Sequence, residues 1–258
     1  MSEAHATQTG AASGAGAASR FTWRSAAATS KGNVRTHNED SILDLPSAGL
    51  WVVADGMGGH NAGDVASRMI VEALRSIRRR SRASSFLDDV EDRLAAVNDR
   101  LYRESLASDA GMSGSTVVAL LALERHVVSL WAGDSRIYRA RDGNFAQITR
   151  DHSEVQELLD EGVLDSGSAV PQAAANVITR AVGGGADLYL DVELRELRHN
   201  DRYLLCSDGL YKEMAETEVA RHVASNDPDG ACRSLMKQAL DGPCTDNVSV
   251  IVVQFESA

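Results

Sequence analysis

The chain has 258 residues, of which 43% are hydrophobic and 24% are charged, and its formal net charge is −11. This composition is typical of a globular protein with a sizeable core, and the acidic excess argues against nucleic acid or an anionic membrane surface as the main partner. The three cysteines, Cys206, Cys232 and Cys244, are widely spaced and form no CxxC pair. We therefore expect no disulfide framework and no thiolate zinc site, and a reducing, cytoplasmic location.

The N-terminal region is rich in Ala, Gly and Ser, which predicts a disordered tail over residues 1–20 and one continuous domain over residues 21–258. This region has neither the basic start nor the hydrophobic centre of a secretory signal. No stretch approaches the roughly 18 apolar residues of a membrane span, so we expect no membrane insertion.

The first half of the domain contains two predicted strands followed by two amphipathic helices. The strands are predicted at Phe21–Thr29 and Gly49–Ala54. Apolar residues at helical spacing predict a helix over Ala62–Arg80, and a second helical pattern extends from Leu87 to Leu106. The Ala62–Arg80 pattern ends in a run of three arginines.

Strands dominate the second half. They are predicted at Ser115–Leu123, His126–Ala132, Arg136–Arg141, Phe145–Thr149, Leu188–Leu197, Arg202–Cys206 and Val248–Phe255. The Asp-Gly-Asn turn at residues 142–144 predicts a hairpin between two of them. Residues 151–185 predict a short helix and a mobile flap, and further helices are predicted at Lys212–Ala224 and Pro228–Leu240. Hairpins combined with paired helices indicate antiparallel sheets covered by helices.

Four aspartates are each associated with one of these apolar strands. Asp55 ends VVAD, Asp134 ends LWAGD, Asp208 ends YLLCSD, and Asp246 precedes the last strand in TDNVSVIVV. Each of them alone could form a turn or cap a helix. If neighbouring strand ends align, the carboxylates converge and cations must cancel their repulsion. Oxygen ligands without a His or Cys cluster favour Mg²⁺ or Mn²⁺ over zinc.

Gly56 and the charged stretch KGNVRTHNED, residues 31–40, extend this candidate site. Gly56 leaves its carbonyl open as a further oxygen ligand, although a tight turn is an alternative reason for a glycine. In the charged stretch, Arg35 precedes Glu39 and Asp40, and a guanidinium matches the two-oxygen edge of a phosphate. Alone, the stretch indicates a charged loop with an internal ion pair. Beside the aspartates it predicts a phosphate clamp at a metal site.

Eight segments occur in an order that has a known parallel. They are VRTHNED (34–40), VVADGMGGHNAG (52–63), GSTVVALLAL (114–123), WAGDSRIYR (131–139), ITRDHS (148–153), VITRAVGG (177–184), LLCSDGL (204–210) and TDNVSVIVV (245–253). Together they resemble the metal-dependent serine/threonine protein phosphatases, the type 2C family, in their bacterial form. The resemblance implies an α+β fold, an α-β-β-α four-layer sandwich of two antiparallel sheets flanked by helix pairs. It also implies hydrolysis of phosphoserine and phosphothreonine in proteins by a metal-activated water.

The resemblance assigns roles to the aspartates. It makes Asp55 the carboxylate that bridges two tightly bound Mn²⁺ or Mg²⁺ ions. Asp208 and Asp246 join Asp55 at the first ion, and the carbonyl of Gly56 serves the second. Asp134 matches a ligand of a third, weaker ion that it shares with Asp208, and shaping the GDSR turn is the alternative role.

The remaining matches surround these ligands. Glu39 and Asp40 match positions that hold the second ion or its waters, Arg35 matches the phosphate-binding arginine, and Asn247 is expected to steady Asp246. Some members of the family have a histidine two residues after the first aspartate as general acid. Met57 stands at that position here and has no exchangeable proton. His60 is the nearest substitute, with a structural hydrogen bond as its alternative role.

The resemblance further implies phosphorylated protein substrates, and a Ser/Thr protein kinase and its targets as partners of a monomeric enzyme. Two alternatives remain. A pseudophosphatase with the same fold is opposed by the intact set of Asp55, Asp134, Asp208, Asp246 and Arg35. A two-metal nuclease is opposed by the net charge of −11 and by the lack of a basic groove in the sequence pattern.

Overall fold

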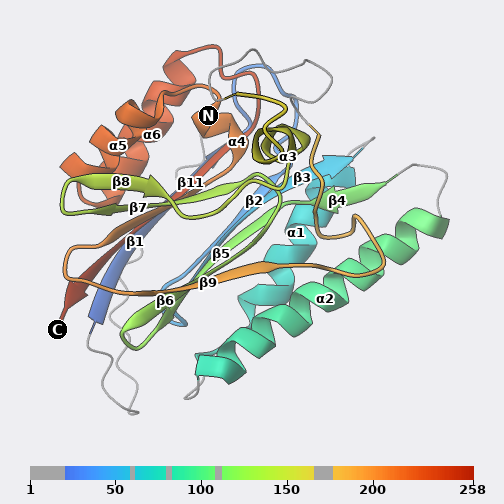
Figure 1. The fold of residues 1–258 in the computed structure, drawn as a ribbon, viewed down its shortest axis with the longest axis horizontal. Coiled ribbons are helices and arrows are strands. Elements are labelled where there is room, and N and C mark those ends of the chain that lie inside the picture. Colours follow the sequence, from blue (N-terminus) through green and yellow to red (C-terminus); the bar gives the residue numbers. More distant parts are fainter. Residues whose placement is uncertain (1–20, 59–61, 80–82, 108–111, 166–176) are drawn as a thin grey trace.

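The computed structural model of the chain describes residues 21–58, 62–79, 83–107, 112–165 and 177–258. The predicted tail, residues 1–20, lies outside the described residues. The described part forms four layers: two antiparallel sheets pack face to face, and a pair of helices covers the outer face of each sheet (Figure 1). The predicted α-β-β-α sandwich is confirmed.

The first sheet has five strands in the order β1-β11-β10-β7-β8. Their bounds are Phe21–Ser30 (β1), Arg136–Arg141 (β7), Asn144–Gln147 (β8), Arg202–Cys206 (β10) and Val248–Ser257 (β11). The hairpin between β7 and β8 was predicted from its Asp-Gly turn, and Asp142 and Gly143 have the positive φ angles, 51° and 78°, that this turn requires. β11 pairs with β1 over the whole length of both strands, from Phe21 opposite Ser257 to Ser30 opposite Val248.

The second sheet has the order β2-β3-β5-β6-β9, and the short β4 pairs with the end of β3. The bounds are Asp40–Leu45 (β2), Leu50–Gly58 (β3), Ser113–Ser115 (β4), Val117–Leu123 (β5), His126–Ala132 (β6) and Asp191–Glu196 (β9). The predicted end of β3 at Ala54 is wrong. β3 continues through Asp55 to Gly58 because β2 pairs with Asp55 and β4 pairs with residues 56–58.

Helices cover both outer faces of the sandwich. They are Ala62–Arg75 (α1), Ala83–Ala107 (α2), Glu154–Asp160 (α3), Asp208–Tyr211 (α4), Glu216–Ser225 (α5) and Pro228–Asp241 (α6). α1 ends at Arg75 and not at Arg80. The helix predicted over Lys212–Ala224 begins only at Glu216 (α5), and the one-turn helix α4, which lies before the predicted range, was not predicted. Among the described residues, no helix combines the length and the apolar content needed to cross a bilayer.

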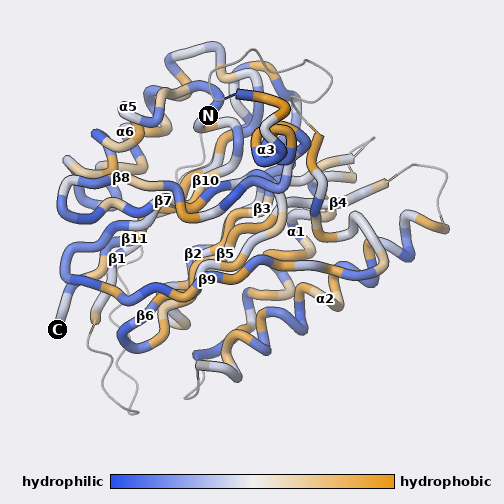
Figure 2. Tube along the Cα trace, in the orientation of Figure 1, coloured by the Kyte–Doolittle hydropathy of each residue, from blue (hydrophilic) through white to orange (hydrophobic). Residues whose placement is uncertain are grey.

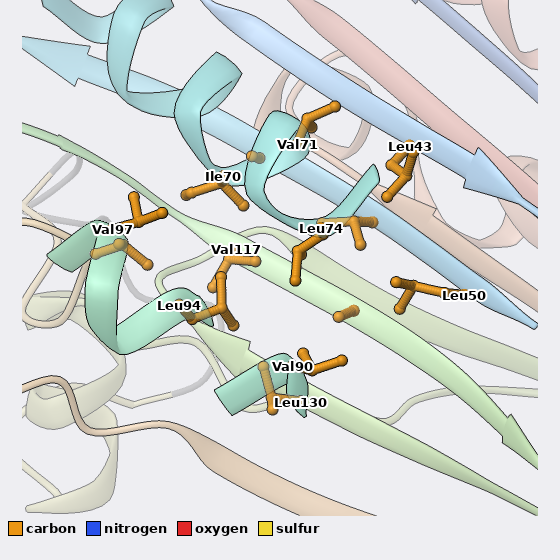
Figure 3. Packing of buried hydrophobic residues seen from close by; sticks show 14 of the residues in the cluster. Leu43, Leu50, Ile70, Val71, Leu74, Val90, Leu94, Val97, Val117 and Leu130 are labelled. Atoms are coloured by element: carbon orange, nitrogen blue, oxygen red, sulfur yellow. The ribbon is translucent and has the colours of Figure 1, made fainter. Parts of the chain in front are cut away.

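Three apolar layers hold these elements together, and the strands between them are the most hydrophobic part of the trace (Figure 2). Between the sheets, the rings of Trp23, Trp51 and Phe255 meet edge to face with centroids 5.8–6.1 Å apart. On the outer face of the six-stranded sheet, Leu74 of α1 and Leu94 of α2 point toward the strands (Figure 3). The sandwich is therefore rigid enough to hold the strand ends in fixed positions.

Candidate metal centre

The pairing of β2 with β3 places two carboxylates opposite each other. Asp40, the first residue of β2, is the cross-strand partner of Asp55 in β3. Like charges in directly opposite positions repel, and burial adds the cost of removing each charge from water. The fold therefore brings together two acidic groups that need a compensating partner.

Asp40 is buried and is held by hydroxyl groups from the other sheet. Its Oδ2 accepts hydrogen bonds from Ser207 Oγ at 2.8 Å and from Ser249 Oγ at 2.7 Å. Its Oδ1 is buried and has no hydrogen-bond partner within the described ranges. Burial raises the pKa of Asp40 to about 7, with the charges of Asp208 and Asp246 acting in the same direction.

The backbone of Asp55 is fixed by the GST sequence at residues 114–116. The Asp55 N–H donates to Thr116 Oγ1 at 3.1 Å, and the Asp55 carbonyl accepts from the Thr116 N–H at 2.8 Å and from Ser115 Oγ at 3.0 Å. Thr116 Oγ1 also lies 2.7 Å from Ser135 Oγ in the GDSR loop. Thr116 thus ties the loop that carries Asp134 to the strand that carries Asp55.

The carboxylates act on one another as a group. Burial raises the pKa of Asp55 well above its usual range, and the negative charges of Asp40, Asp208, Asp134 and Asp246 raise it further. Burial also raises the pKa of Asp134 to about 6, followed by the effect of Asp208. Four of the five residues in this group, all except Asp40, were the strand-associated aspartates of the sequence. The structure brings them close enough to interact.

Asp208 begins the one-turn helix α4, with Ser207 as its N-cap, two residues after β10 ends at Cys206 as predicted. The Lys212 ammonium lies one turn later and donates to Asp208 Oδ2 at 2.5 Å. Between them, the Tyr211 hydroxyl donates to the Asp134 carbonyl at 3.1 Å and lies 3.3 Å from Asp134 Oδ2. α4 therefore positions the carboxylates of both Asp208 and Asp134.

The ion pair of Arg136 with Asp151 packs against the ring of Tyr211 and is largely buried. The Arg136 guanidinium lies 3.6 Å from the centroid of the Tyr211 ring, and it donates to Asp151 at 2.7 Å. Next to Asp151, His152 Nδ1 accepts from the Gly133 N–H at 3.2 Å. The RDHS sequence thus holds the GDSR loop in place.

Arg35 pairs with a residue outside its own charged stretch. Its Nε lies 2.9 Å from Asp246 Oδ1, and its terminal nitrogen donates to Asp246 Oδ2 at 3.0 Å. This is the two-pronged geometry in which a guanidinium binds a carboxylate or a phosphate. The hydrogen bond to Asp246 raises the pKa of Arg35 further. The internal ion pair considered from the sequence is replaced by this long-range pair.

The Asn247 side chain holds the charged stretch and not Asp246. Its carbonyl oxygen accepts from the Glu39 N–H at 2.8 Å, and its amide donates to the carbonyls of Lys31 at 3.0 Å and His37 at 2.9 Å. Only its backbone N–H reaches Asp246, donating to Oδ1 at 2.9 Å. Asn247 therefore positions the stretch that carries Arg35 and Glu39.

Gly56 is required by close packing of backbone on backbone. A Cβ atom added there would lie 2.0 Å from the Gly63 carbonyl oxygen and 2.7 Å from the Glu39 carbonyl oxygen. A Cβ atom added at Gly63 would lie 2.9 Å from Glu39 Oε1. The two glycines let the start of α1 touch β3, and the Glu39 carboxylate lies beside Gly63 and the Gly56 carbonyl.

Met57 and His60 are the two residues that bear on the predicted general acid. Met57 lies opposite Gly114 of β4, on the part of β3 that extends beyond Asp55. His60 lies outside the described residues.

The donor set fits divalent cations that prefer oxygen ligands. Two buried carboxylate oxygens, Asp40 Oδ1 and Asp134 Oδ1, have no hydrogen-bond donor in the described part of the chain. Within the same residues, no three His, Cys, Asp or Glu side chains already form a complete metal site. Asp208 and Asp246 instead pair with Lys212 and Arg35. Carboxylate and carbonyl oxygens are the ligands of Mg²⁺ and Mn²⁺, so the chemistry of the cluster suits these ions once the side-chain cations give way.

Sequence reasoning missed several residues that support the cluster. They are Thr116, Ser207, Tyr211, Lys212 and Ser249. A hydroxyl residue at or inside an otherwise apolar strand, as in LLCSD and VSVIVV, is the signal that could have identified two of them.

A family model described as "Protein phosphatase 2C" matches residues 29–237. The serine/threonine protein phosphatase PstP of Mycobacterium tuberculosis is 34% identical over 230 residues, which are 89% of this chain. The serine/threonine phosphatase stp of Listeria welshimeri is 36% identical over 200 residues, 74% of this chain and 79% of that protein. The chain spans only 44% of the length of PstP.

Solved structures give the same picture. PppA, described as a key regulatory component of T6SS in Pseudomonas aeruginosa, superposes with a TM-score of 0.84 at 43% identity, covering 91% of this chain and 98% of PppA. The catalytic domain of the serine/threonine protein phosphatase PstP in complex with two manganese ions superposes with a TM-score of 0.81 at 33% identity. That match covers 92% of this chain and 99% of the PstP domain.

Proposed function

Because the chain belongs to the protein phosphatase 2C family, we propose that it hydrolyses phosphoserine and phosphothreonine in proteins, with divalent cations held by its aspartate cluster. The observation that carries this proposal is the group of five interacting carboxylates with a bidentate arginine at its edge. A cluster of this kind has a large unbalanced negative charge, and a structural role alone does not call for it.

Two Mn²⁺ ions are the proposed cofactors, as the manganese complex of the PstP domain supports, and Mg²⁺ is the proposed substitute. Asp55, Asp208, Asp246 and the Gly56 carbonyl would hold them, with Glu39 and Asp40 holding the second ion or its waters. When bound, the ions would polarise the phosphate ester and increase the acidity of the attacking water. A third and weaker site is proposed at Asp134 and Asp208.

The residues of the chain provide binding and positioning. The Arg35 guanidinium can exchange the Asp246 carboxylate for two phosphate oxygens, which orients the phosphorus and stabilises the negative charge that spreads over it. Thr116 and Tyr211 keep Asp55 and Asp134 in fixed positions. Met57 cannot donate a proton to the leaving oxygen, so His60 remains the proposed general acid.

We further propose that the enzyme works as a cytoplasmic monomer that opposes a Ser/Thr protein kinase on shared targets. Similarity to PppA supports a regulatory role of this kind, because that protein is described as a regulatory component of a secretion system.

The test is hydrolysis of p-nitrophenyl phosphate and of a phosphothreonine peptide by the purified chain with Mn²⁺, with Mg²⁺ or after exhaustive EDTA treatment. We expect turnover of both substrates with either ion and its loss on chelation, with recovery when Mn²⁺ is added back. Full activity after chelation would contradict the metal-dependent mechanism. Binding of the phosphopeptide without turnover would indicate a pseudophosphatase, and cleavage of DNA in place of the peptide would indicate a nuclease.

A further inference from the structure

A cavity of about 440 Å³ opens beside the metal centre, and the end of β3 forms part of its wall. The apolar side chains that line it come from four separate segments of the chain. They are Met57, Met112, Ile178, Leu188 and Tyr189. The volume lies in the range of ordinary ligand pockets.

Met57 connects this cavity to the catalytic residues. Met57 follows Asp55 by two positions in β3, and alternate residues of a strand point to the same side of a sheet. The facing residue in β4 is Gly114, where an added Cβ would lie 3.7 Å from the Met57 Cε atom. Met57 therefore links the cavity wall to the strand that carries Asp55.

Apolar side chains form much of the cavity wall, and two of them are unusually accessible. Tyr189 is 68% exposed and Met112 is 66% exposed, although both are large side chains that water solvates poorly. Among the residues that the structure describes, two charged residues line the cavity: Arg180, which pairs with Asp191 at 3.0 Å, and Asp187, which is exposed to solvent. The cavity therefore offers apolar contact beside a centre that binds charge, which is the arrangement needed to hold a substrate with one charged and one apolar group.

We propose that this cavity binds an apolar side chain of the phosphoprotein substrate, two residues away from the phosphorylated serine or threonine. The inference rests on the proposed function. Met57 is two strand residues, roughly 7 Å, from Asp55, and an extended substrate chain covers the same span in two residues. The occupant is therefore a Leu-, Ile-, Met- or Phe-type side chain at that position. The cavity makes this chain selective among phosphoproteins.

The experiment compares phosphothreonine peptides of one polar host sequence that carry Leu or Ser two residues before or two residues after the phosphothreonine. With Mn²⁺ present, we expect kcat/KM to be about tenfold higher for one of the two Leu peptides than for its Ser counterpart. Tyr189→Ser and, independently, Met112→Thr should reduce this preference to within about threefold. Both residues are exposed, and neither variant should change turnover of p-nitrophenyl phosphate.

Leu194→Ser is the matched control, because Leu194 is an apolar side chain of similar exposure, 61%, that does not line the cavity. It should keep the full preference. Equal kcat/KM for the Leu and Ser peptides, or a preference that survives both cavity variants, would overturn the inference while leaving the phosphatase function intact. Failure to hydrolyse every phosphate ester, including p-nitrophenyl phosphate, would instead overturn the proposed function and this inference with it.

Discussion

Arg35 is tied to the metal centre before any phosphate arrives. Its side chain is 50% exposed, and that of its partner Asp246 is 31% exposed, so water screens the pair and the net free energy of the interaction is small. A pair of this kind positions the guanidinium without holding it too tightly to be released. The exchange of a carboxylate for a phosphate then keeps the number of hydrogen bonds unchanged.

Arg35→Ala should raise KM for p-nitrophenyl phosphate by roughly tenfold, since the bidentate contact with the phosphate oxygens is lost. Arg35→Lys should restore little, because an ammonium is a point charge and cannot form the two parallel bonds. Steady-state kinetics with saturating Mn²⁺ would measure both effects.

Arg24→Ala is the control for this prediction. Arg24 is 48% exposed and pairs with Glu256 at the end of the β1–β11 pair that lies away from Asp246. It should leave KM unchanged. If the KM of Arg35→Ala also equals that of the wild type, Arg35 forms only a surface ion pair with Asp246 and does not bind the phosphate.

Lys212 occupies a place where a cation is expected to bind. Its ammonium contacts Asp208, and the charge of Asp134 also acts on it. Lys212→Met should therefore tighten Mn²⁺ binding at the weak site by about twofold to fivefold, in line with the net strength of partly exposed ion pairs. Isothermal titration calorimetry would measure the affinity, and Lys237→Met, which removes the similar pair with Asp241 on α6, should leave it unchanged. An unaltered affinity in Lys212→Met would mean that the lysine does not compete with the ion.

At the scale of elements, β3 and α1 approach each other closely at Gly56 and Gly63. Gly56→Ala should destabilise the protein by about 3 kcal/mol or more, because the added methyl group meets the Gly63 carbonyl oxygen and neither backbone can shift without disturbing a sheet. Thermal denaturation would measure the loss. Gly185→Ala is the control: an added Cβ there has no neighbour closer than 3.8 Å, so a comparable loss in both variants would rule out the steric explanation.

How far the sequence could predict these elements depended on local composition. β5, β6, β7, β10 and β11 were found because apolar runs are local signals. β2 was missed because Asp40 and Asp44 interrupt its short apolar pattern, DSILDL, and its place is set by pairing with β3. The one-turn helix α4 was not predicted, because a single turn is too short to show helical periodicity.

The acidic residues of the candidate site could be predicted from the sequence, but the residues that contact them could not. Asp55 and Asp134 stood out because each interrupts an apolar run, a feature visible within a few residues. The contact of Arg35 with Asp246 joins positions 211 residues apart, and no local pattern reports it. The contacts of Ser207 and Ser249 with Asp40 span 167 and 209 residues, so the sequence can show the two hydroxyls but not their partner.

At the scale of the whole molecule, the buried carboxylates should make the metal-free protein sensitive to pH. Asp40 has a pKa of about 7 in the folded chain against an ordinary value of 3.8, and that of Asp134 is about 6. A carboxyl with a raised pKa binds its proton more tightly in the folded chain than in the unfolded chain. Its contribution to the free energy of unfolding is therefore largest at low pH and is lost as the pH rises through the folded pKa. We expect the metal-free protein to unfold at a lower temperature at pH 8 than at pH 6, by a few degrees for Asp40 alone, which corresponds to on the order of 1 kcal/mol.

Asp40→Asn is the control for this pH effect, because it keeps an acceptor for Ser207 and Ser249 but cannot ionise. His152, whose pKa burial lowers, acts in the opposite direction in both proteins, so the difference between the two melting curves reports the ionisation of Asp40 together with its effect on Asp55. Saturating Mn²⁺ should remove the difference. Parallel curves for the two metal-free proteins would show that Asp40 is not protonated in the folded state.

The pairing of β11 with β1 and β10 has a consequence for the order in which the protein folds. β11 lies between an early strand and a late one, and Asp246, Asn247 and Ser249 all lie at its beginning. A growing polypeptide on the ribosome cannot close the five-stranded sheet until this segment emerges, because pairings of such high contact order form last and slowly. The nascent chain therefore has no means of holding Asp40 or Arg35 in place. The carboxylate cluster is complete only when β11 has entered the sheet.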